Sequence, residues 1–202
     1  MKKKGQPTGL GLAELERIKK LVVIAMFSDD ELMDRLVLKG GNALDLVYRI
    51  SPRASVDLDF SMESDFPEEE REVFRGRVEA ALRRTFREEG YEVFDVRMEN
   101  RPRELTQDVA DFWGGYAVEF KLIHKTRYEE SSGNVEELRR SALRLGSGQK
   151  LLIDISKFEY TAKKEPQDLD GYRIFVYSPE MMVCEKLRAI CQQMPEYGPV
   201  VN

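Results

Sequence analysis

The apolar residues of this chain recur with two periods, and the period of each segment predicts whether it forms a helix or a strand. In residues 12–27 they recur every three or four positions, which indicates an amphipathic helix. Similar patterns predict helices at residues 30–36, 42–50, 67–89, 135–145 and 179–193. Strict alternation at residues 56–61 predicts a strand, as do the apolar runs at residues 36–38, 91–99, 116–123, 150–156 and 172–176. The charged residues 163–170 are predicted to form a loop.

The order of these elements predicts an α+β fold, in which a mixed β-sheet is flanked by helices. We divide the chain into a core of residues 1–160 and a second part, residues 161–202, with a strand and the start of a C-terminal helical region. Pro67 lies at the first turn of a helix that Gly90 stops, and Pro179 opens the last helix. The segment after that helix is typical of a connection, so we expect further helical structure beyond residue 202.

The composition is that of an ordinary globular protein and argues against several classes. Hydrophobic residues make up 42% of the chain and charged residues 34%. The longest apolar run, residues 21–27, is too short to span a membrane, and no signal peptide follows the basic start. Cys184 and Cys191 match neither a disulfide framework nor a zinc site, so we expect a cytoplasmic protein.

The net charge of −5 argues against a protein that coats nucleic acid. Short basic stretches such as residues 139–144 do occur, and each is more often a solvated surface than a binding site.

Two acids in the strand predicted at residues 56–61 are the first candidates for chemistry. Asp57 and Asp59 are two residues apart, so both side chains point to the same face of the strand. Two carboxylates held this close repel each other unless a cation lies between them. Mg²⁺ fits because it prefers oxygen ligands and completes its shell with water and substrate phosphates. The alternative is a solvent-facing strand edge that happens to carry two acids.

A pair of glycines precedes this strand. Gly40 and Gly41 follow an apolar strand and come directly before the helix that starts at Asn42. Without β-carbons the backbone can approach a phosphate closely, and the N-terminus of a helix offers free N–H groups to an anion. A glycine turn followed by an acid pair on the next strand therefore suggests a site for a metal-bound triphosphate.

A site of this kind needs a further carboxylate to place the attacking oxygen. Asp154 is the best candidate because it is the only acid in an otherwise apolar predicted strand. The alternative is that a nearby arginine pairs with Asp154 and its role is structural. Glu119, in the strand at residues 116–123, is a second candidate for the same role.

Four linked segments resemble the AbiEii/AbiGii toxin family of nucleotidyltransferases, in the DNA polymerase beta-like superfamily. They are KGGNAL at residues 39–44, RASVDLDF at 53–60, IDI at 153–155 and SPEMMVCEKLRA at 178–189. The resemblance implies a Mg²⁺-dependent transfer of a nucleoside monophosphate from an NTP to a hydroxyl of RNA, such as tRNA, or of protein. It also implies a toxin of a toxin–antitoxin or phage-resistance system, with a cognate antitoxin as partner and no membrane association.

The resemblance also implies roles for individual residues. Asp57 and Asp59 match the metal ligands, to which we add Asp154 as a third, and Ser55 matches the serine before the acid pair. Gly40 and Gly41 match the phosphate turn, and we expect Asn42 to hold the phosphates together with them. Lys186 matches the lysine near the triphosphate. We also expect Arg53 to neutralise phosphate charge, with a structural ion pair as the alternative.

The chain departs from the family pattern in two ways. The separation of Gly41 and Asp57 exceeds the minimal pattern, and the family's further acidic block after the EKLRA helix is missing. We therefore expect part of the site or of the helical region to lie beyond residue 202. The alternative function is a non-catalytic module of the same fold that binds nucleotides or a partner.

Overall fold

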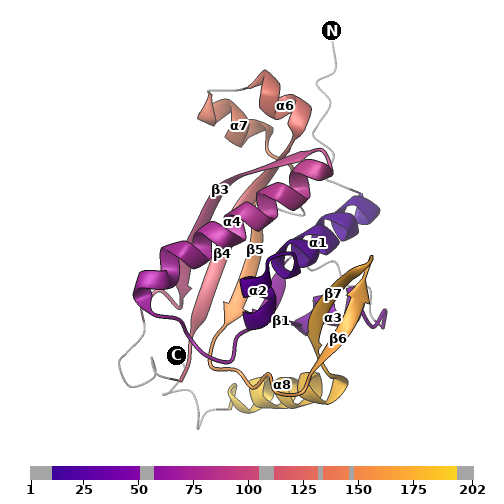
Figure 1. Cartoon of the computed structure of the whole chain (residues 1–202), viewed down its shortest axis with the longest axis vertical. Helices are drawn as coiled ribbons and strands as arrows, with labels where there is room; N and C mark the ends of the chain where they lie inside the picture. The colour runs from indigo at the N-terminus through magenta and orange to yellow at the C-terminus, as the bar shows by residue number, and fades with distance from the viewer. Residues whose placement is uncertain (1–10, 51–56, 105–111, 132–133, 146–147, 195–202) are drawn as a thin grey trace.

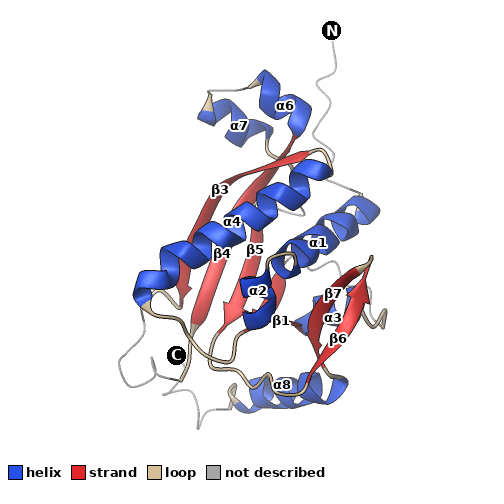
Figure 2. Cartoon of the chain, viewed as in Figure 1, coloured by secondary structure: helices blue, strands red, loops and turns tan. Residues whose placement is uncertain are grey.

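A computed structural model describes residues 11–50, 57–104, 112–131, 134–145 and 148–194 of the chain (Figures 1 and 2). The helices among them are α1 (Leu12–Phe27), α2 (Asp30–Arg35), α3 (Gly40–Leu46), α4 (Arg71–Glu88), α6 (Lys125–Glu130), α7 (Val135–Ser141) and α8 (Pro179–Cys191). The strands are β1 (Val37–Lys39), β2 (Leu58–Ser61), β3 (Tyr91–Arg101), β4 (Gly115–His124), β5 (Leu151–Ser156), β6 (Lys164–Leu169) and β7 (Tyr172–Tyr177). None of these helices has the length and apolar character needed to cross a membrane.

The strands form one mixed seven-stranded sheet in the order β3-β4-β5-β2-β1-β7-β6. β2 runs parallel to β5 and antiparallel to β1, while β1 runs parallel to β7. β5 also pairs with β4 in antiparallel fashion, and β4 with β3. The α+β prediction is therefore confirmed. The order also brings β2 and β5 together, although more than 90 residues separate them in the sequence.

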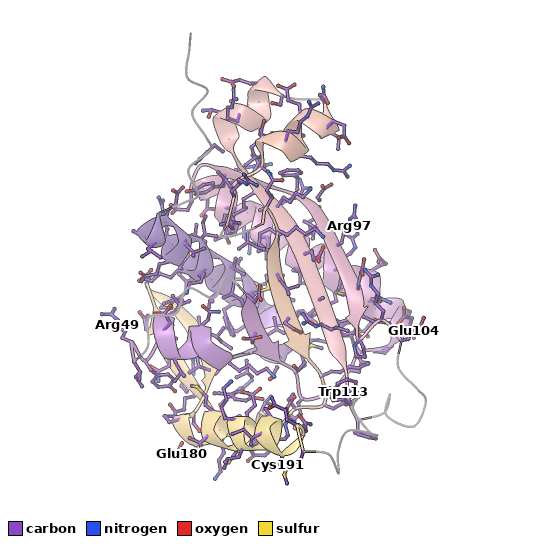
Figure 3. The ribbon with its side chains drawn as sticks, turned by 180° about the vertical axis from the view of Figure 1, so that it is seen from behind. Arg49, Arg97, Glu104, Trp113, Glu180 and Cys191 are labelled. Carbon is purple, nitrogen blue, oxygen red and sulfur yellow. The ribbon has the colours of Figure 1, made fainter. Side chains whose placement is uncertain are left out.

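The two faces of the sheet have different environments. α1 and α4 cross one face, and side chains from alternate positions of β4 and β5 are buried beneath them (Figure 1). The buried core on this side includes Phe60, Phe86, Phe120, Ile153 and Ile155. The side chains between them, including those of Asp154 and Ser156, are only half-buried and point to the opposite face. Among the residues that the structure describes, no helix covers that second face over β3, β4 and β5, as the view from behind shows (Figure 3). We call it the open face.

Short-range signals explain where the main helices begin and end. α8 begins as predicted at Pro179, and the Ser178 hydroxyl accepts a hydrogen bond from the Met181 N–H (3.3 Å). Asp29 caps α2 in the same way through the Leu32 N–H (3.2 Å). The helix predicted at residues 67–89 begins as a 3-10 turn and continues as α4 to Glu88, just before Gly90 adopts a positive φ of 81°.

The prediction of a loop at residues 163–170 is wrong, because Lys164–Leu169 forms the edge strand β6 and pairs with β7. Asp170 and Gly171 connect the two strands, both with positive φ (52° and 87°), as a tight hairpin turn requires. The Asp-Gly dipeptide was therefore the signal that the charge pattern obscured. Charged residues suit an edge strand because they discourage pairing with another chain.

Two helix predictions need smaller corrections, and one short helix was missed. α3 begins at Gly40 rather than Asn42 and ends at Leu46. α7 ends at Ser141 rather than Leu145, because the chain turns back and the Leu143 N–H donates a hydrogen bond to the Leu122 carbonyl (2.8 Å). The short helix α6 was not predicted.

Candidate active site

The strand register brings the predicted acids together on the open face. Asp59 of β2 lies directly opposite Asp154 of β5 and, on its other side, opposite Lys39 of β1. Neighbouring strands are about 4.8 Å apart, so the three side chains form a row across the sheet. Asp57 lies two residues before Asp59 at the entrance to β2 and is exposed. Both acids therefore lie next to Asp154, which the sequence alone could not show.

The ionisation of these acids reflects their proximity. Burial, and then the nearby charge of Asp154, raise the pKa of Asp59 from 3.8 to about 6, with smaller contributions from Glu185 and Asp57. Burial also raises the pKa of Asp154, and Asp57 adds to this effect, while Arg101 and Lys39 act against it. The positive charges of Lys39 and Arg101 thus offset only part of the negative charge of these acids. A divalent cation would relieve this repulsion.

Gly40 lies against Asp59, as the proposed site requires. Its φ is +71°, and a β-carbon at this position would lie 2.5 Å from the Asp59 Oδ2 atom. The position therefore excludes a side chain for two reasons, backbone conformation and lack of space. The glycine turn and the acid pair form one site.

We expect Gly40→Ala to lower the free energy of unfolding by about 1–2 kcal/mol through backbone strain alone. It should also reduce metal-dependent nucleotide binding, because the new methyl group displaces the Asp59 carboxylate. Urea denaturation and thermal stabilisation by Mg²⁺ with NTP measure the two effects. Gly90→Ala is the matched control, because Gly90 has φ +81° but no atom within 4 Å of its β-carbon position. If both variants bind nucleotide normally, the contact with Asp59 has no functional role.

Asn42 lies at the junction of α3 and β2. Its buried side-chain amide donates a hydrogen bond to the backbone carbonyl of Asp57. This contact ties the first turn of α3 to the start of the strand that carries both acids. The Asn42 side chain therefore positions Asp57.

Lys39 is a site residue that the sequence analysis missed. It is buried, and its Nζ atom lies 3.0 Å from the Ser156 hydroxyl and 2.8 Å from Glu185 Oε1. A second carboxylate, that of Glu159, lies 3.8 Å away. The signal was a single lysine in a buried apolar strand directly before the glycine pair. Its partners could not be predicted because they come from distant parts of the chain.

α8 contributes to the site through Glu185 and Arg188. Arg188 forms an ion pair with Glu159 (2.7 Å), so Lys39, Glu185, Glu159 and Arg188 form one network. Lys186 lies on the exposed side of the same helix, and no described residue forms a hydrogen bond or ion pair with it. The structure thus brings Glu185 and Arg188 of the EKLRA segment to the site, but does not place Lys186 in contact with the acids.

Asp154 already has a partner, because Arg101 of β3 approaches its Oδ2 atom to 2.7 Å. The two alternatives for Asp154 are therefore compatible: it pairs with an arginine and still lies beside Asp59. The Arg101 side chain is about half exposed (52%), so it can move away at little cost.

Glu119, the competing candidate, pairs with Lys150 (2.5 Å) and lies further along the open face. Arg53 and Ser55 lie outside the described residues.

Two pockets share Glu159 as a lining residue, and one of them includes Asp154. One, of about 350 Å³, lies beside α8 and is lined by Tyr160, Tyr177, Glu185 and Arg188 among others. The other, of about 310 Å³, is lined by Arg101, Trp113 and Asp154 among others. Trp113 lies at the end of the open face nearest α8 (Figure 3). Of the three candidate acids, Asp154 therefore lines a pocket.

The donor set suits Mg²⁺, although the described residues contain no group of three or more His, Cys, Asp or Glu side chains arranged to enclose a metal alone. Mg²⁺ is usually held by one or two carboxylates and completes its shell with water and substrate phosphates. Asp59 supplies carboxylate oxygens directly against the glycine turn, and Asp57 supplies further oxygens at the entrance to β2. The residues present therefore fit a magnesium ion that arrives with its nucleotide.

Comparisons with known proteins found one family and similar solved structures. The model of a family described as nucleotidyl transferase AbiEii toxin, type IV TA system, matches residues 22–198. Among solved structures, the chain is similar to the nucleotidyltransferase toxin MenT4 from Mycobacterium tuberculosis H37Rv, with a TM-score of 0.49 and 16% identity. That similarity covers 88% of this chain and 52% of MenT4, so the chain spans about half the length of that protein. The comparison with curated proteins finds no match.

Proposed function

Because the chain belongs to the AbiEii nucleotidyl transferase toxin family of type IV toxin–antitoxin systems, we propose that it transfers a nucleoside monophosphate from an NTP to a hydroxyl of RNA. The observation that carries this proposal is the contact of Gly40 with Asp59, which itself lies opposite Asp154. The residues that we propose to seat the triphosphate, bind the metal and orient the acceptor are therefore neighbours. In keeping with the family, we also propose an antitoxin as its partner.

In this proposal Asp57 and Asp59 hold the magnesium ion that accompanies the NTP. The ion supplies positive charge that offsets the negative charge of the triphosphate during the reaction. Gly40 and Gly41 leave space for the phosphates, and Asn42 holds Asp57 in place through its backbone carbonyl. Lys186, Arg53 and Ser55 are proposed to contact the triphosphate.

Asp154 is proposed to orient and activate the acceptor. The acceptor hydroxyl oxygen attacks the α-phosphorus of the NTP, and its proton passes to the Asp154 carboxylate. A new phosphorus–oxygen bond forms as the bond between the α-phosphorus and the oxygen bridging to the β-phosphate breaks, and pyrophosphate leaves. The raised pKa of Asp154 makes its carboxylate a better base than an ordinary aspartate. Such catalysis depends on positioning and electrostatics, and needs no nucleophilic side chain.

The test is incubation of the purified protein with labelled NTPs, Mg²⁺ and total RNA. Asp154→Asn should lower the rate of label transfer by about 10²–10⁴-fold, because asparagine cannot accept the proton. The exposed Asp34→Asn on α2 makes the same chemical change away from the site and should leave the rate unchanged.

Two outcomes would contradict the proposal. Equal rates for Asp154→Asn and the wild type would remove Asp154 from the mechanism. If the wild type transfers no label but NTP stabilises it equally with and without Mg²⁺, the chain is a nucleotide-binding module instead. Label recovered in protein rather than in RNA would identify a protein acceptor.

A further inference from the structure

A basic hollow lies at the α6–α7 end of the sheet, away from the acids. Its volume is about 660 Å³, and it is lined by five cationic residues: Lys121, Arg127, Arg139, Arg140 and Arg144. None of the described residues that line it is acidic. Because the chain as a whole carries a net charge of −5, this concentration of positive charge departs from the average surface. We call it the basic hollow.

Two of these cations, Arg140 and Arg144, are not neutralised by a carboxylate of the described residues. Lys121 and Arg139, in contrast, both form ion pairs with Asp95, at 3.1 Å and 2.8 Å. Among the described residues, Arg140 donates only to the Glu136 backbone carbonyl (3.2 Å), and Arg144 meets no carboxylate. Both side chains are exposed. The basic hollow therefore presents free guanidinium groups to the solvent.

The basic hollow and the acids are connected along the open face. In β4, Lys121, Glu119 and Ala117 are two residues apart and share a face, and Ala117 lies directly opposite Asp154. Four residues of strand separate Lys121 from Ala117, which is about 13 Å. A second hollow of about 220 Å³ shares Lys121 and Arg139 with the basic hollow. Its lining adds the cations Arg97 and Lys150 and the acids Asp95 and Glu119, which are the carboxylates that pair with Lys121, Arg139 and Lys150. Arg97 is labelled in Figure 3.

We infer that the basic hollow binds the sugar-phosphate backbone of the acceptor RNA, whose end then reaches Asp154 along the open face. This inference rests on the proposed function. A separation of about 13 Å corresponds to about four stacked nucleotides, since each adds about 3.4 Å. Arginine matches phosphate because its planar guanidinium donates two parallel hydrogen bonds.

An acidic protein is the other class of ligand that positive charge attracts, but the lining disfavours it. Protein interfaces are anchored by buried apolar and aromatic side chains at their centre. The described lining of the basic hollow contains one apolar residue, Ala142. A polar, cationic surface without apolar anchors fits a nucleic-acid backbone better.

The test measures binding of fluorescently labelled total tRNA to the protein across a range of salt concentrations, without NTP. The double variant Arg140→Gln/Arg144→Gln keeps the Asp95 ion pairs intact. It should bind about tenfold more weakly at 0.1 M salt, and the slope of log K against log salt should fall by about 1.5–2. The matched control is Arg77→Gln/Arg84→Gln on α4, which makes the same change in net charge on the helix-covered face. We expect the control to change binding less than twofold, because those residues lie far from the open face.

The experiment separates this inference from the proposed function. Thermal stabilisation by NTP with Mg²⁺ should persist in Arg140→Gln/Arg144→Gln and disappear in Asp59→Asn, which should still bind tRNA. Equal weakening by both arginine pairs would show that only net charge matters and would overturn the inference. Retained tRNA binding by the double variant, together with lost binding of poly-glutamate, would identify an acidic protein as the ligand. Absence of Mg²⁺-dependent NTP stabilisation in the wild type would instead refute the proposed function.

Discussion

Asp59→Asn is expected to reduce label transfer from NTP to RNA by at least about 10⁴-fold. Asp59 is the proposed metal ligand that lies closest to the glycine turn and directly opposite Asp154. Loss of a charged metal ligand removes several kcal/mol of electrostatic stabilisation from the transition state, and each 1.4 kcal/mol is about a factor of ten in rate. Single-turnover transfer with labelled NTP and total RNA measures the effect, with Asp34→Asn as the control.

The same substitution should make the protein without metal more stable. Folding raises the pKa of Asp59 from 3.8 to about 6, so above that pH the folded state holds an unfavourable charge. Between about pH 4 and pH 6 the folded state binds more protons than the unfolded state, and this group's contribution to stability therefore falls as the pH rises. Above about pH 6 the cost is constant. We expect Asp59→Asn to raise the free energy of unfolding by about 3 kcal/mol at pH 7, and by only about 1 kcal/mol at pH 4.5.

Urea denaturation of both proteins in EDTA at the two pH values gives this comparison. Added Mg²⁺ with NTP should then stabilise the wild type and leave the variant unchanged. A variant no more stable than the wild type at pH 7 would show that Asp59 carries no repulsive charge. A variant that transfers label at the normal rate would remove Asp59 from the metal site.

Lys39→Met is expected to lower the free energy of unfolding by about 3 kcal/mol. The Lys39 side chain is 8% exposed and meets Glu185 at 2.8 Å, with Ser156 and Glu159 nearby. Its removal leaves these partly buried carboxylates without their cation, and breaking a buried pair costs about 3–5 kcal/mol. Methionine keeps most of the volume, so the loss of charge is the main change. Urea denaturation at pH 7 measures the effect.

Lys150→Met provides the matched control, because it breaks an exposed Lys–Glu pair in which the lysine is 57% exposed. Such a pair contributes at most about 1 kcal/mol. We also expect faster hydrogen exchange of the α8 amides in Lys39→Met, because Lys39 links the sheet to Glu185 on that helix. Equal destabilisation by the two variants would show that burial of Lys39 adds nothing to its ion pair.

Taken together, these expectations describe a site that lowers stability in order to bind a metal. Asp59 and Asp154 are partly buried and share one negative region, while Lys39 and Arg101 offset only part of it. Residues that reduce folding stability for the sake of a ligand are typical of functional sites. The cation that arrives with the nucleotide would restore the balance.

Local patterns in the sequence determined much of the fold and part of the site. The period-two alternation predicted the strand that carries Asp59, which forms β2 (Leu58–Ser61), whereas Asp57 lies directly before that strand. Proline and glycine at helix ends predicted the bounds of α4 and the start of α8 to within a few residues. These predictions succeeded because strand faces and helix caps depend on residues a few positions apart.

Only the tertiary structure decided which distant residues meet. Lys164–Leu169 forms the strand β6 because β7 is available as its partner, and the charge pattern of this segment did not reveal that pairing. Asp154 lies beside Asp59 because β5 runs parallel to β2, and Arg101 reaches it from β3. The fold likewise brings Lys39 into contact with Glu159 and Glu185, which are distant in the sequence. It also gathers the cations of the basic hollow from separate elements. Strand order and register depend on how the whole sheet buries its apolar face, and no short segment of sequence contains that information.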